Sequence, residues 1–281
     1  MSELPLVTIL TPTWNRAACL PALKRSLEVQ GCRDFEWLII DDGSSDETPQ
    51  LLASWSGATE FPCRFVRTVN GGKHRAINRA MPEVHGEAVF IVDSDDELPP
   101  EAMARIAELW PKVRADAGLV GLVGYRAHRG GLRIGAAFPA SLDRADSIAL
   151  HWRYGCRGDK AEVFKRHALL DNPFPEFDRE NFLTESVVWN RIAGKGQLLL
   201  EPSTLYLCDY LDDGLSARSL ELRVKNPRGA QLYYRELMGS RIPPVPRLRA
   251  IANFMRISLL AAIGRFRECC IAGFRFGGDR R

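Results

Sequence analysis

The sequence predicts an α/β fold, in which a mostly parallel sheet carries helices on both faces and is followed by a C-terminal helical tail. Two observations support this prediction. Over the first 120 residues, short apolar runs that suit buried strands alternate with amphipathic segments of helical length. Several of these runs end in polar or acidic turns, as expected where parallel strands deliver side chains to a ligand crevice at their carboxyl ends.

The order of the elements follows from the same periodicities. We expect strands near residues 6–10, 36–41, 64–68 and 88–93. Helices are expected between and after them, near residues 17–29, 47–55, 73–81 and 100–114. Residues 118–138 are expected to add further strands, and residues 139–215 to complete the domain with a helix near 183–194 and returning strands.

Composition excludes several classes of protein. With 281 residues and 46% apolar content, the chain can bury one substantial core. A net charge of +3 is too small to indicate a nucleic-acid-binding protein. The seven cysteines include no Cys-x-x-Cys pair, so neither a disulfide framework nor a zinc site is expected. The first residues show no basic region followed by a long apolar stretch, so we expect a cytoplasmic protein without a secretory signal.

The most informative stretch runs from Val89 to Pro99, where an apolar strand ends in three carboxylates. Asp93, Asp95 and Asp96 fall within four positions, so mutual repulsion would raise their proton affinity unless a cation offset it. Mg²⁺ or Mn²⁺ would supply that offset, because both bind hard oxygen ligands and keep positions open for a diphosphate. The alternative is an acidic turn that stabilises the positive end of the helix expected at 100–114.

A second acidic strand end lies about fifty residues earlier, where an apolar run reaches Asp41 and Asp42. Asp46 is a suitable N-cap for the following helix, but capping does not account for the first two acids. Both follow a strand at the edge where open α/β sheets bind ligands. One of them is therefore expected to accept the imide N–H of a pyrimidine base or a ribose hydroxyl.

Two further turns carry residue types that bind ligands. Thr-Pro-Thr-Trp-Asn-Arg at 11–16 follows the first strand and offers hydroxyl and amide groups, although Thr and Asn in turns are more often structural. Asn-Gly-Gly-Lys at 70–73 opens a helix, and its glycines allow close backbone approach while Lys73 and Arg75 add positive charge. It is not a Walker A loop, which requires Gly, four residues, Gly-Lys and then Ser or Thr.

The order of these motifs is informative. The chain presents in turn Thr-Pro-Thr-Trp-Asn-Arg, Ile-Ile-Asp-Asp-Gly-Ser-Ser-Asp, Asn-Gly-Gly-Lys-His and Val-Asp-Ser-Asp-Asp. Over residues 5 to about 215, this set resembles family 2 glycosyltransferases of the GT-A fold, whose central sheet is Rossmann-like. The resemblance implies sugar transfer from a nucleotide-diphosphate donor with inversion. We expect a catalytic domain at 1–217, with a nucleotide-sugar-binding half at 1–120 and an acceptor half at 121–217, and a basic helical tail at 218–281.

The resemblance also implies roles for individual residues. Asp42 matches the family acid that reads the base. Asp93 and Asp95 form the Asp-x-Asp unit, in which Asp95 or Asp96 is the direct ligand of Mg²⁺ or Mn²⁺ and a neighbour holds the ribose. The residues expected at the donor nucleotide are Thr11, Pro12, Thr13, Asn15, Arg16, Asp41, Asp42, Gly72, Lys73, Asn78, Asp93 and Ser94.

Inversion requires a general base close to the acceptor hydroxyl. Glu185 occupies the place where family members commonly carry the Asp of a Glu-Asp pair, but the pair here reads Thr184-Glu185. That departure leaves Glu180 and Asp178 as alternatives. The helix dipole also accounts for an acid in the first turn of a helix, without any catalytic role.

The acceptor side has weaker signals. Gly-Asp-Lys-Ala-Glu-Val-Phe at 158–164 resembles a segment near the acceptor in a subset of the family. Asp159 and Lys160, with Glu180, are therefore candidates for contacts with sugar hydroxyls or phosphate. The alternative is a solvated ion pair ahead of a strand. Residues 206–216 resemble the closing strand and the loop over the donor.

The end of the chain is basic and amphipathic. Residues 241–281 contain nine Arg and two acids, a net charge of +7. The apolar positions that recur near helical spacing are Leu248, Ile251, Phe254, Met255, Leu259 and Ile263, with Arg249, Arg256, Arg265 and Arg267 between them. The longest uncharged segment, Ile257 to Gly264, is too short to span a bilayer. We expect a helix that lies on an anionic membrane surface, or one that packs on the catalytic domain or a second subunit.

The leading hypothesis is a metal-dependent inverting glycosyltransferase that uses a nucleotide sugar, with UDP as the expected nucleotide. It would extend a saccharide or lipid-linked acceptor in glycan synthesis, in the cytoplasm or at the inner face of the membrane. One alternative is a sugar-nucleotide nucleotidyltransferase, but the turn at 11–16 lacks the glycines of that class. The other is a non-catalytic nucleotide-binding or membrane-scaffold protein.

Overall fold

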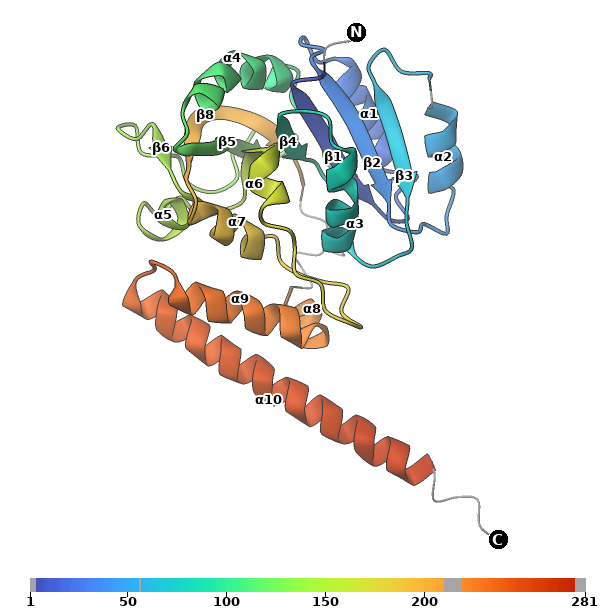
Figure 1. Ribbon diagram of the computed structural model, residues 1–281, viewed down its shortest axis with the longest axis vertical. Helices are drawn as coiled ribbons and strands as arrows, with labels where there is room; N and C mark the ends of the chain where they lie inside the picture. The colour runs from blue at the N-terminus through green and yellow to red at the C-terminus, as the bar shows by residue number, and fades with distance from the viewer. Residues whose placement is uncertain (1–3, 56, 210–218, 276–281) are drawn as a thin grey trace.

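An eight-stranded sheet lies at the centre of the computed structural model, which describes residues 4–55, 57–209 and 219–275 (Figure 1). Its order in that part of the chain is β3-β2-β1-β4-β7-β5-β8-β6. The strands are β1 (Val7–Thr13), β2 (Phe35–Asp41), β3 (Cys63–Arg67), β4 (Ala88–Ile91), β5 (Leu119–Ala127), β6 (Arg144–Ala145), β7 (Lys160–Lys165) and β8 (Gln197–Leu207). The parallel order β3-β2-β1-β4 is that of one half of a doubly wound sheet.

Helices cover both faces of the sheet because side chains alternate along each buried strand. Ile9 and Trp37 pack in one layer, with α1 (Leu20–Glu28), α2 (Thr48–Trp55) and α4 (Ala102–Ala115). Leu10 and Leu38, the next residues along, pack in the other layer. The helices of that second layer are α3 (Lys73–Ala80), α5 (Ser147–Trp152), α6 (Arg166–Leu170) and α7 (Ser186–Ala193). The predicted fold class is therefore confirmed.

Burial on both faces explains why the central strands read as continuous apolar runs. Every residue of β1 and β2 is buried, which is typical of parallel strands between two helical layers. Trp37 is fully buried and its ring stacks on Trp55 with centroids 5.6 Å apart. Burying a large apolar side chain stabilises the folded state by roughly 1.5–3 kcal/mol. Such burial holds β1 and β2 rigidly in place, and with them the edge of the sheet where the acids lie.

The second half of the sheet departs from the parallel pattern. β7 inserts between β4 and β5 and runs antiparallel to both, while β5 and β8 are parallel. The prediction of several strands over 118–138 was too generous: β5 ends at Ala127, and beyond it only an isolated bridge at Arg133 pairs within that range. The loop that follows contains left-handed glycines at 131 and 135, which end regular pairing.

Three helices follow the sheet domain, α8 (Ser219–Lys225), α9 (Pro227–Gly239) and α10 (Pro244–Arg275). α10 runs along α9 and extends beyond the body of the molecule (Figure 1). Ala250 and Ile257 are buried, and Gln231 of α9 donates a hydrogen bond to Ser258 Oγ over 2.9 Å. Among the residues described, no helix combines the length and apolarity needed to cross a membrane. The predicted boundary at 217, and the loop expected up to 216, fall outside the described residues.

Candidate active site

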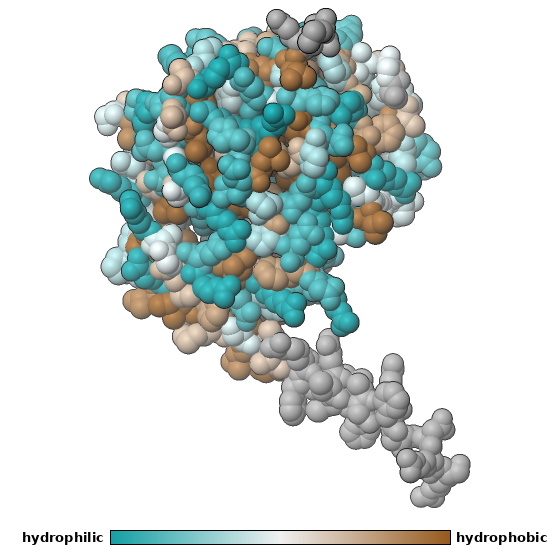
Figure 2. All heavy atoms as spheres, in the orientation of Figure 1, coloured by the Kyte–Doolittle hydropathy of each residue, from teal (hydrophilic) through white to brown (hydrophobic). Residues whose placement is uncertain are grey.

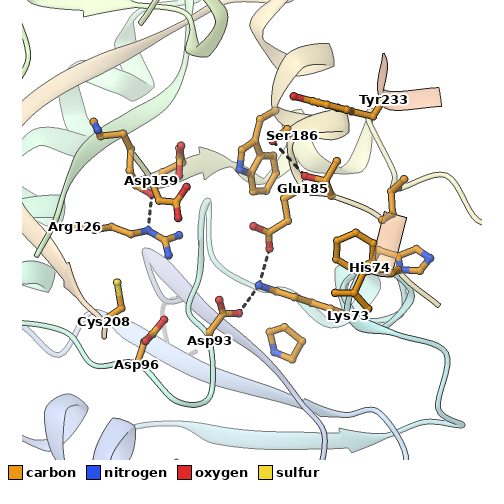
Figure 3. Close-up of a pocket in the computed structure, with 18 of the residues that line it drawn as sticks. Lys73, His74, Asp93, Asp96, Arg126, Asp159, Glu185, Ser186, Cys208 and Tyr233 are labelled. Carbon is orange, nitrogen blue, oxygen red and sulfur yellow. Dashed lines mark hydrogen bonds and ion pairs between the residues drawn. The ribbon is translucent and has the colours of Figure 1, made fainter. Parts of the chain in front are cut away.

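The carboxyl ends of β1, β2 and β4 open into a cavity of about 880 Å³ (Figure 3). This volume lies within the ~300–1,000 Å³ typical of small-molecule sites. Most of the residues singled out from the sequence line it, although they come from segments up to about 170 residues apart. They are Pro12, Thr13, Arg16, Asp42, Gly72, Lys73, Asp93, Ser94, Asp95, Asp96, Asp159, Lys160 and Glu185.

Four of the residues expected at the nucleotide do not line the cavity, and three of these lie in or just after β1 and β2. The buried Thr11 hydroxyl accepts a hydrogen bond from the Trp37 indole over 2.9 Å. Asn15 Oδ1 accepts from the Ser45 N–H over 2.8 Å, and Asp41 Oδ1 accepts from the Ser44 N–H over 2.9 Å. Thr11 and Asn15 thus join β1 and its turn to β2 and its turn, Asp41 holds the turn after β2, and the structure does not bring these three side chains into the cavity.

Two further candidates have structural partners. Asn78 bonds to the backbone of Phe174 through both ends of its amide, at 2.8 and 2.9 Å, and does not line the cavity. The buried Glu180 carboxylate accepts from the N–H groups of Arg228 and Gly229, at 2.8 and 2.9 Å, and so caps the start of α9. Glu180 does not line the cavity, and both of its carboxylate oxygens are engaged in this cap.

Asp42 anchors the Gly-Gly loop. Its carboxylate accepts hydrogen bonds from Gly71 N at 3.0 Å and from Gly72 N at 2.7 Å. Burial raises the pKa of Asp42 even though these two hydrogen bonds favour the ionised form. Gly72 has φ +94°, and a Cβ there would lie 1.9 Å from the Asn181 carbonyl oxygen. The loop thus needs glycine both for its conformation and for its close contact with the backbone of Asn181.

Lys73 lies between two acids on opposite sides of the cavity (Figure 3). Its Nζ is 2.8 Å from Glu185 Oε1 and forms a direct ion pair with Asp93. Burial opposes the charge on Lys73, but the two carboxylates outweigh it and raise its pKa. Burial likewise opposes ionisation of Asp93, and Lys73 outweighs it and lowers the pKa of that carboxyl. The cavity therefore presents a fixed ammonium group between the acid cluster and Glu185.

The remaining two acids of the cluster have different surroundings. Asp95 is partly exposed, with Oδ2 3.9 Å from Arg16 Nε. The buried Asp96 accepts a 2.7 Å hydrogen bond from the Tyr206 hydroxyl, which in turn accepts one from the Asp93 N–H. Burial, together with the charges of Asp93 and Asp95, raises the pKa of Asp96 to about 7. This excess of negative charge favours a bound cation.

Helix capping does not account for the cluster. α4 begins at Ala102 with Glu101 at its N-cap position, well after the acids. Glu97, the other acid considered for capping, instead pairs with Arg129 over 2.6 Å. The structural alternative for this turn is therefore wrong, and Asp95 and Asp96 need another explanation.

The donor set suits a metal held jointly with a ligand. In the part of the chain that the structure describes, no three His, Cys, Asp or Glu side chains are grouped to hold a metal ion by themselves. Asp95 and Asp96 offer two carboxylates beside an open cavity. Mg²⁺ is commonly bound in this way, by one or two carboxylates together with substrate phosphates. These residues therefore fit a metal that arrives with a diphosphate.

Comparison with known proteins identifies the family. Residues 8–169, more than half of the chain, match the family model of glycosyl transferase family 2. The chain belongs to this family. The matched segment carries Asp42, Lys73 and the Asp-x-Asp unit, and it disfavours the nucleotidyltransferase alternative.

Curated relatives align with part of the chain. An undecaprenyl-phosphate 4-deoxy-4-formamido-L-arabinose transferase from Enterobacter sp. (strain 638) is 35% identical over 120 residues, which are 40% of this chain and 34% of the relative. Its namesake from Sodalis glossinidius is 29% identical over 187 residues, 63% of this chain and 54% of the relative. A PGL/p-HBAD biosynthesis glycosyltransferase from Mycobacterium tuberculosis is 33% identical over 104 residues, 37% of this chain and 41% of the relative. The chain thus spans about a third to a half of these relatives.

Solved structures confirm the GT-A fold. Residues 1–349 of S. aureus TarS in complex with UDP-GlcNAc superpose with a TM-score of 0.64 at 17% identity, covering 89% of this chain and 72% of that one. The mannosyltransferase PcManGT from Pyrobaculum calidifontis, in complex with GDP-Man and Mn²⁺, gives a TM-score of 0.60 at 20% identity, covering 98% and 81%.

Two charged residues of this family 2 site were missed in the sequence. Arg126 of β5 donates from Nε to the Lys160 carbonyl oxygen over 2.8 Å, and its guanidinium lies 4.1 Å from the Tyr206 ring centroid. Glu162 lines the same wall. Burial, with the negative charges of Asp159 and Glu185, raises its pKa to about 7 although Arg126 opposes the rise. Glu162 shares a strand face with Lys160, so the two-residue period of β7 was a usable signal.

Lys160 itself is buried rather than solvated. Its Nζ donates to the carbonyl oxygens of Arg157 and Gly158, at 3.1 and 2.9 Å. The alternative of a solvated ion pair is therefore wrong for this residue. Its ammonium group holds the turn before β7 and leaves Asp159 on the cavity wall.

α5, α7, α8 and α9 line another part of the cavity, which we call its apolar end, mainly with apolar side chains. These are Ile148, Leu150, Trp152, Trp189, Leu222, Tyr233 and Leu237, and the same helices add the polar His151, Asn190 and Arg223. His74 also lines the cavity, and its Nδ1 has no hydrogen-bond partner within the described residues. Burial, with the charge of nearby Arg75, lowers the pKa of His74 to about 4, so its ring is neutral at pH 7. The cavity therefore combines a charged end with a largely apolar end, and its wall beside Lys73 carries one imidazole nitrogen without a hydrogen-bond partner in the described residues.

Proposed function

We propose that this chain transfers a sugar from a nucleotide-diphosphate donor to a lipid-linked saccharide, with inversion and with Mg²⁺ or Mn²⁺. The observation that carries the proposal is the shared cavity. The acid cluster and Glu185 face it from two sides, with Lys73 between them (Figure 3). The donor phosphates could thus bind beside the acid cluster while the acceptor hydroxyl lies beside Glu185, in the same cavity.

The charged end is suited to the donor. Pro12, Thr13 and Asp42 would border the nucleotide, and Asp95 with Asp96 would hold the metal beside the diphosphate. The metal would stabilise the negative charge that develops on the leaving nucleotide diphosphate. UDP is the proposed nucleotide because Asp42 can accept the imide N–H of uracil, and TarS is known in complex with UDP-GlcNAc.

Glu185 is the proposed general base. Of the three acids considered for this role, Glu180 caps α9 and Asp178 is 85% exposed beside Arg179, which leaves Glu185 on the cavity wall. A base within about 3 Å of an acceptor hydroxyl would take its proton as the oxygen attacks the anomeric carbon. A phosphate acceptor is already ionised at neutral pH and needs no such base, so we favour a hydroxyl acceptor.

The apolar end supports an acceptor with a lipid portion. Aromatic and aliphatic side chains of α5, α7 and α9 form a surface on which the apolar portion of a lipid-linked acceptor can pack. Several relatives are named as undecaprenyl-phosphate transferases. We therefore propose a polyprenyl-linked saccharide as acceptor, used at the cytoplasmic face of a membrane.

Transfer assays test this proposal directly. Purified protein would be incubated with UDP- and GDP-sugars, Mn²⁺, and polyprenyl-linked or free saccharides, with nucleotide release and product mass as readouts. Glu185→Gln should reduce transfer by roughly 10²–10⁴-fold while UDP binding by calorimetry is retained. Glu60→Gln, at an 81% exposed position, is the matched control. UDP binding without turnover of any donor would instead support the non-catalytic alternative.

A further inference from the structure

α10 has apolar side chains on two opposite faces. One face includes Ala250 and Ile257, which are buried where the helix packs along α9. The other includes Leu248, Met255 and Leu259, which are 65%, 59% and 62% exposed. Val245 and Ile263 are exposed as well, at 58% and 46%. Packing within the protein explains the first face and leaves the second without a partner in the described structure.

The exposed residues form a straight stripe. At about 100° per residue, Leu248, Met255 and Leu259 fall within roughly 40° of one another, and about opposite to Ile257. In Figure 2, hydrophobic atoms gather at the lower edge of the molecule, where the first half of α10 lies. We call Leu248, Met255 and Leu259 the α10 stripe.

Arginines border the α10 stripe on both sides. Arg249 and Arg256 lie about 80–100° to one side of it, and Arg247 about 100° to the other, and all three are exposed. The sequence repeats this spacing further along with Arg265 and Arg267. Residues 237–267 contain six Arg and no Asp or Glu. The stripe thus lies between two rows of positive charge.

The arginines distinguish between two possible partners for the α10 stripe, a second copy of α10 and an anionic lipid surface. A second copy of α10 packed on the stripe would bring arginine rows together without acids to pair them, and like charges in a helix interface are destabilising. An anionic lipid surface complements both features, because acyl chains accept the apolar residues and headgroups pair with the arginines.

We infer that α10 docks the protein on an anionic lipid bilayer, with the α10 stripe in the headgroup region. The helix lies in the surface plane and does not cross it. Its opposite face packs on α9, whose Tyr233 and Leu237 line the apolar end of the cavity. Docking therefore brings that end of the cavity close to the bilayer. The inference rests on α10 alone and holds whether or not the proposed reaction is correct.

Vesicle co-sedimentation of the full-length protein tests the stripe. The protein should bind phosphatidylcholine vesicles that contain phosphatidylglycerol and should not bind phosphatidylcholine alone. Leu248→Gln, Met255→Gln and Leu259→Gln in one variant should weaken binding tenfold or more. The matched control replaces Val69, Leu132 and Leu170 by Gln, since these are also exposed apolar residues but lie elsewhere, and it should bind like the wild type.

Charge variants test the contribution of the arginines that border the α10 stripe. Arg249→Gln with Arg256→Gln should weaken binding roughly tenfold or more, because each nearby basic residue contributes on the order of a fivefold change. Arg25→Gln with Lys112→Gln removes the same charge from other exposed sites and should leave binding unchanged. Circular dichroism confirms that each variant is folded. Equal binding of the stripe variant and the wild type would overturn the inference, as would light scattering that shows a stripe-dependent dimer with no vesicle affinity.

Discussion

Lys73 Nζ lies 2.8 Å from Glu185 Oε1 and pairs at the same time with Asp93. One ammonium group therefore joins the first acid of the Asp-x-Asp unit to the proposed base. Because the carboxylates belong to segments about 90 residues apart, Lys73 also joins the turn after β4 to the segment that begins α7. Its neighbour Gly72 reinforces this connection through its contact with Asn181.

Lys73→Met should leave Asp93 and Glu185 without their shared cation. We expect the free energy of unfolding to fall by about 1–3 kcal/mol, the usual cost of an unpaired charged group, and transfer to fall with it. Urea unfolding monitored by tryptophan fluorescence measures the first effect. Lys73→Arg keeps the charge and should recover part of the stability; a loss as large as that of the methionine variant would argue against the ion pair.

Chelation should abolish transfer, and Mn²⁺ should restore it. Asp95→Asn and Asp96→Asn remove the proposed metal ligands and should raise the Mn²⁺ concentration needed for half-maximal activity by tenfold or more. Electron paramagnetic resonance of Mn²⁺ with UDP measures binding without turnover. Asp178→Asn changes an exposed carboxyl outside the cavity and should behave like the wild type. Full activity after chelation would remove the metal from the proposal.

Gly72→Ala should be much more damaging than Gly71→Ala. At position 72 the backbone has a positive φ that other residues rarely adopt, and the methyl carbon would lie 1.9 Å from a backbone oxygen. We therefore expect the free energy of unfolding to fall by at least about 2 kcal/mol. At position 71 its nearest neighbour is the flexible Arg75 side chain, at 2.8 Å, and a loss under about 1 kcal/mol is expected. Thermal unfolding compares the two. Similar melting temperatures for both variants would contradict the close contact.

Glu162→Gln should stabilise the protein at alkaline pH. Burial raises the pKa of Glu162 from 4.5 to about 7, so the folded protein retains a proton that the unfolded chain releases. The favourable contribution of neutral Glu162 to the free energy of unfolding is fully present below pH 4.5 and is lost as the pH rises through 7. The glutamine variant does not ionise, so its advantage should grow to about 2–3 kcal/mol above pH 8.

Unfolding at several pH values measures this difference, with Glu60→Gln as an exposed control. Arg126 and a backbone hydrogen bond favour the ionised form of Glu162, whereas burial, Asp159 and Glu185 oppose it. A variant that is less stable than the wild type at alkaline pH would show that Arg126 outweighs burial.

Much of the fold was predictable because local pattern and tertiary environment agree. Strands such as β2 are buried on both faces, so their sequences are continuously apolar. The acids at the ends of β2 and β4 could be recognised in the sequence as candidate site residues, because few structural roles require a carboxylate directly after a buried strand. Asp42, Asp93 and Asp95, which the sequence predicts to share one site, all line the cavity.

Polar residues with distant backbone partners were harder to interpret. Asn78 reaches Phe174 and Glu180 reaches Gly229, contacts that span 96 and 49 residues. Nothing in the local sequence distinguishes such a structural side chain from one that binds a ligand. Arg126 was missed for a related reason: it reaches the cavity because the antiparallel β7 pairs with β5, and that insertion has no local signature.

Glu180 and Asn226 also indicate which part of the chain can be removed without disturbing the rest. Asn226 Oδ1 accepts from the N–H groups of Asn181 and Phe182, and Glu180 caps α9 in return. In a shortened chain that stopped before Asn226, the N–H groups of Asn181 and Phe182 and the Glu180 carboxylate would lose these hydrogen-bond partners. All three groups lie next to the segment that carries Glu185. α8 and α9 are thus not a detachable appendage, and a minimal folded fragment should keep them and be shortened only within α10.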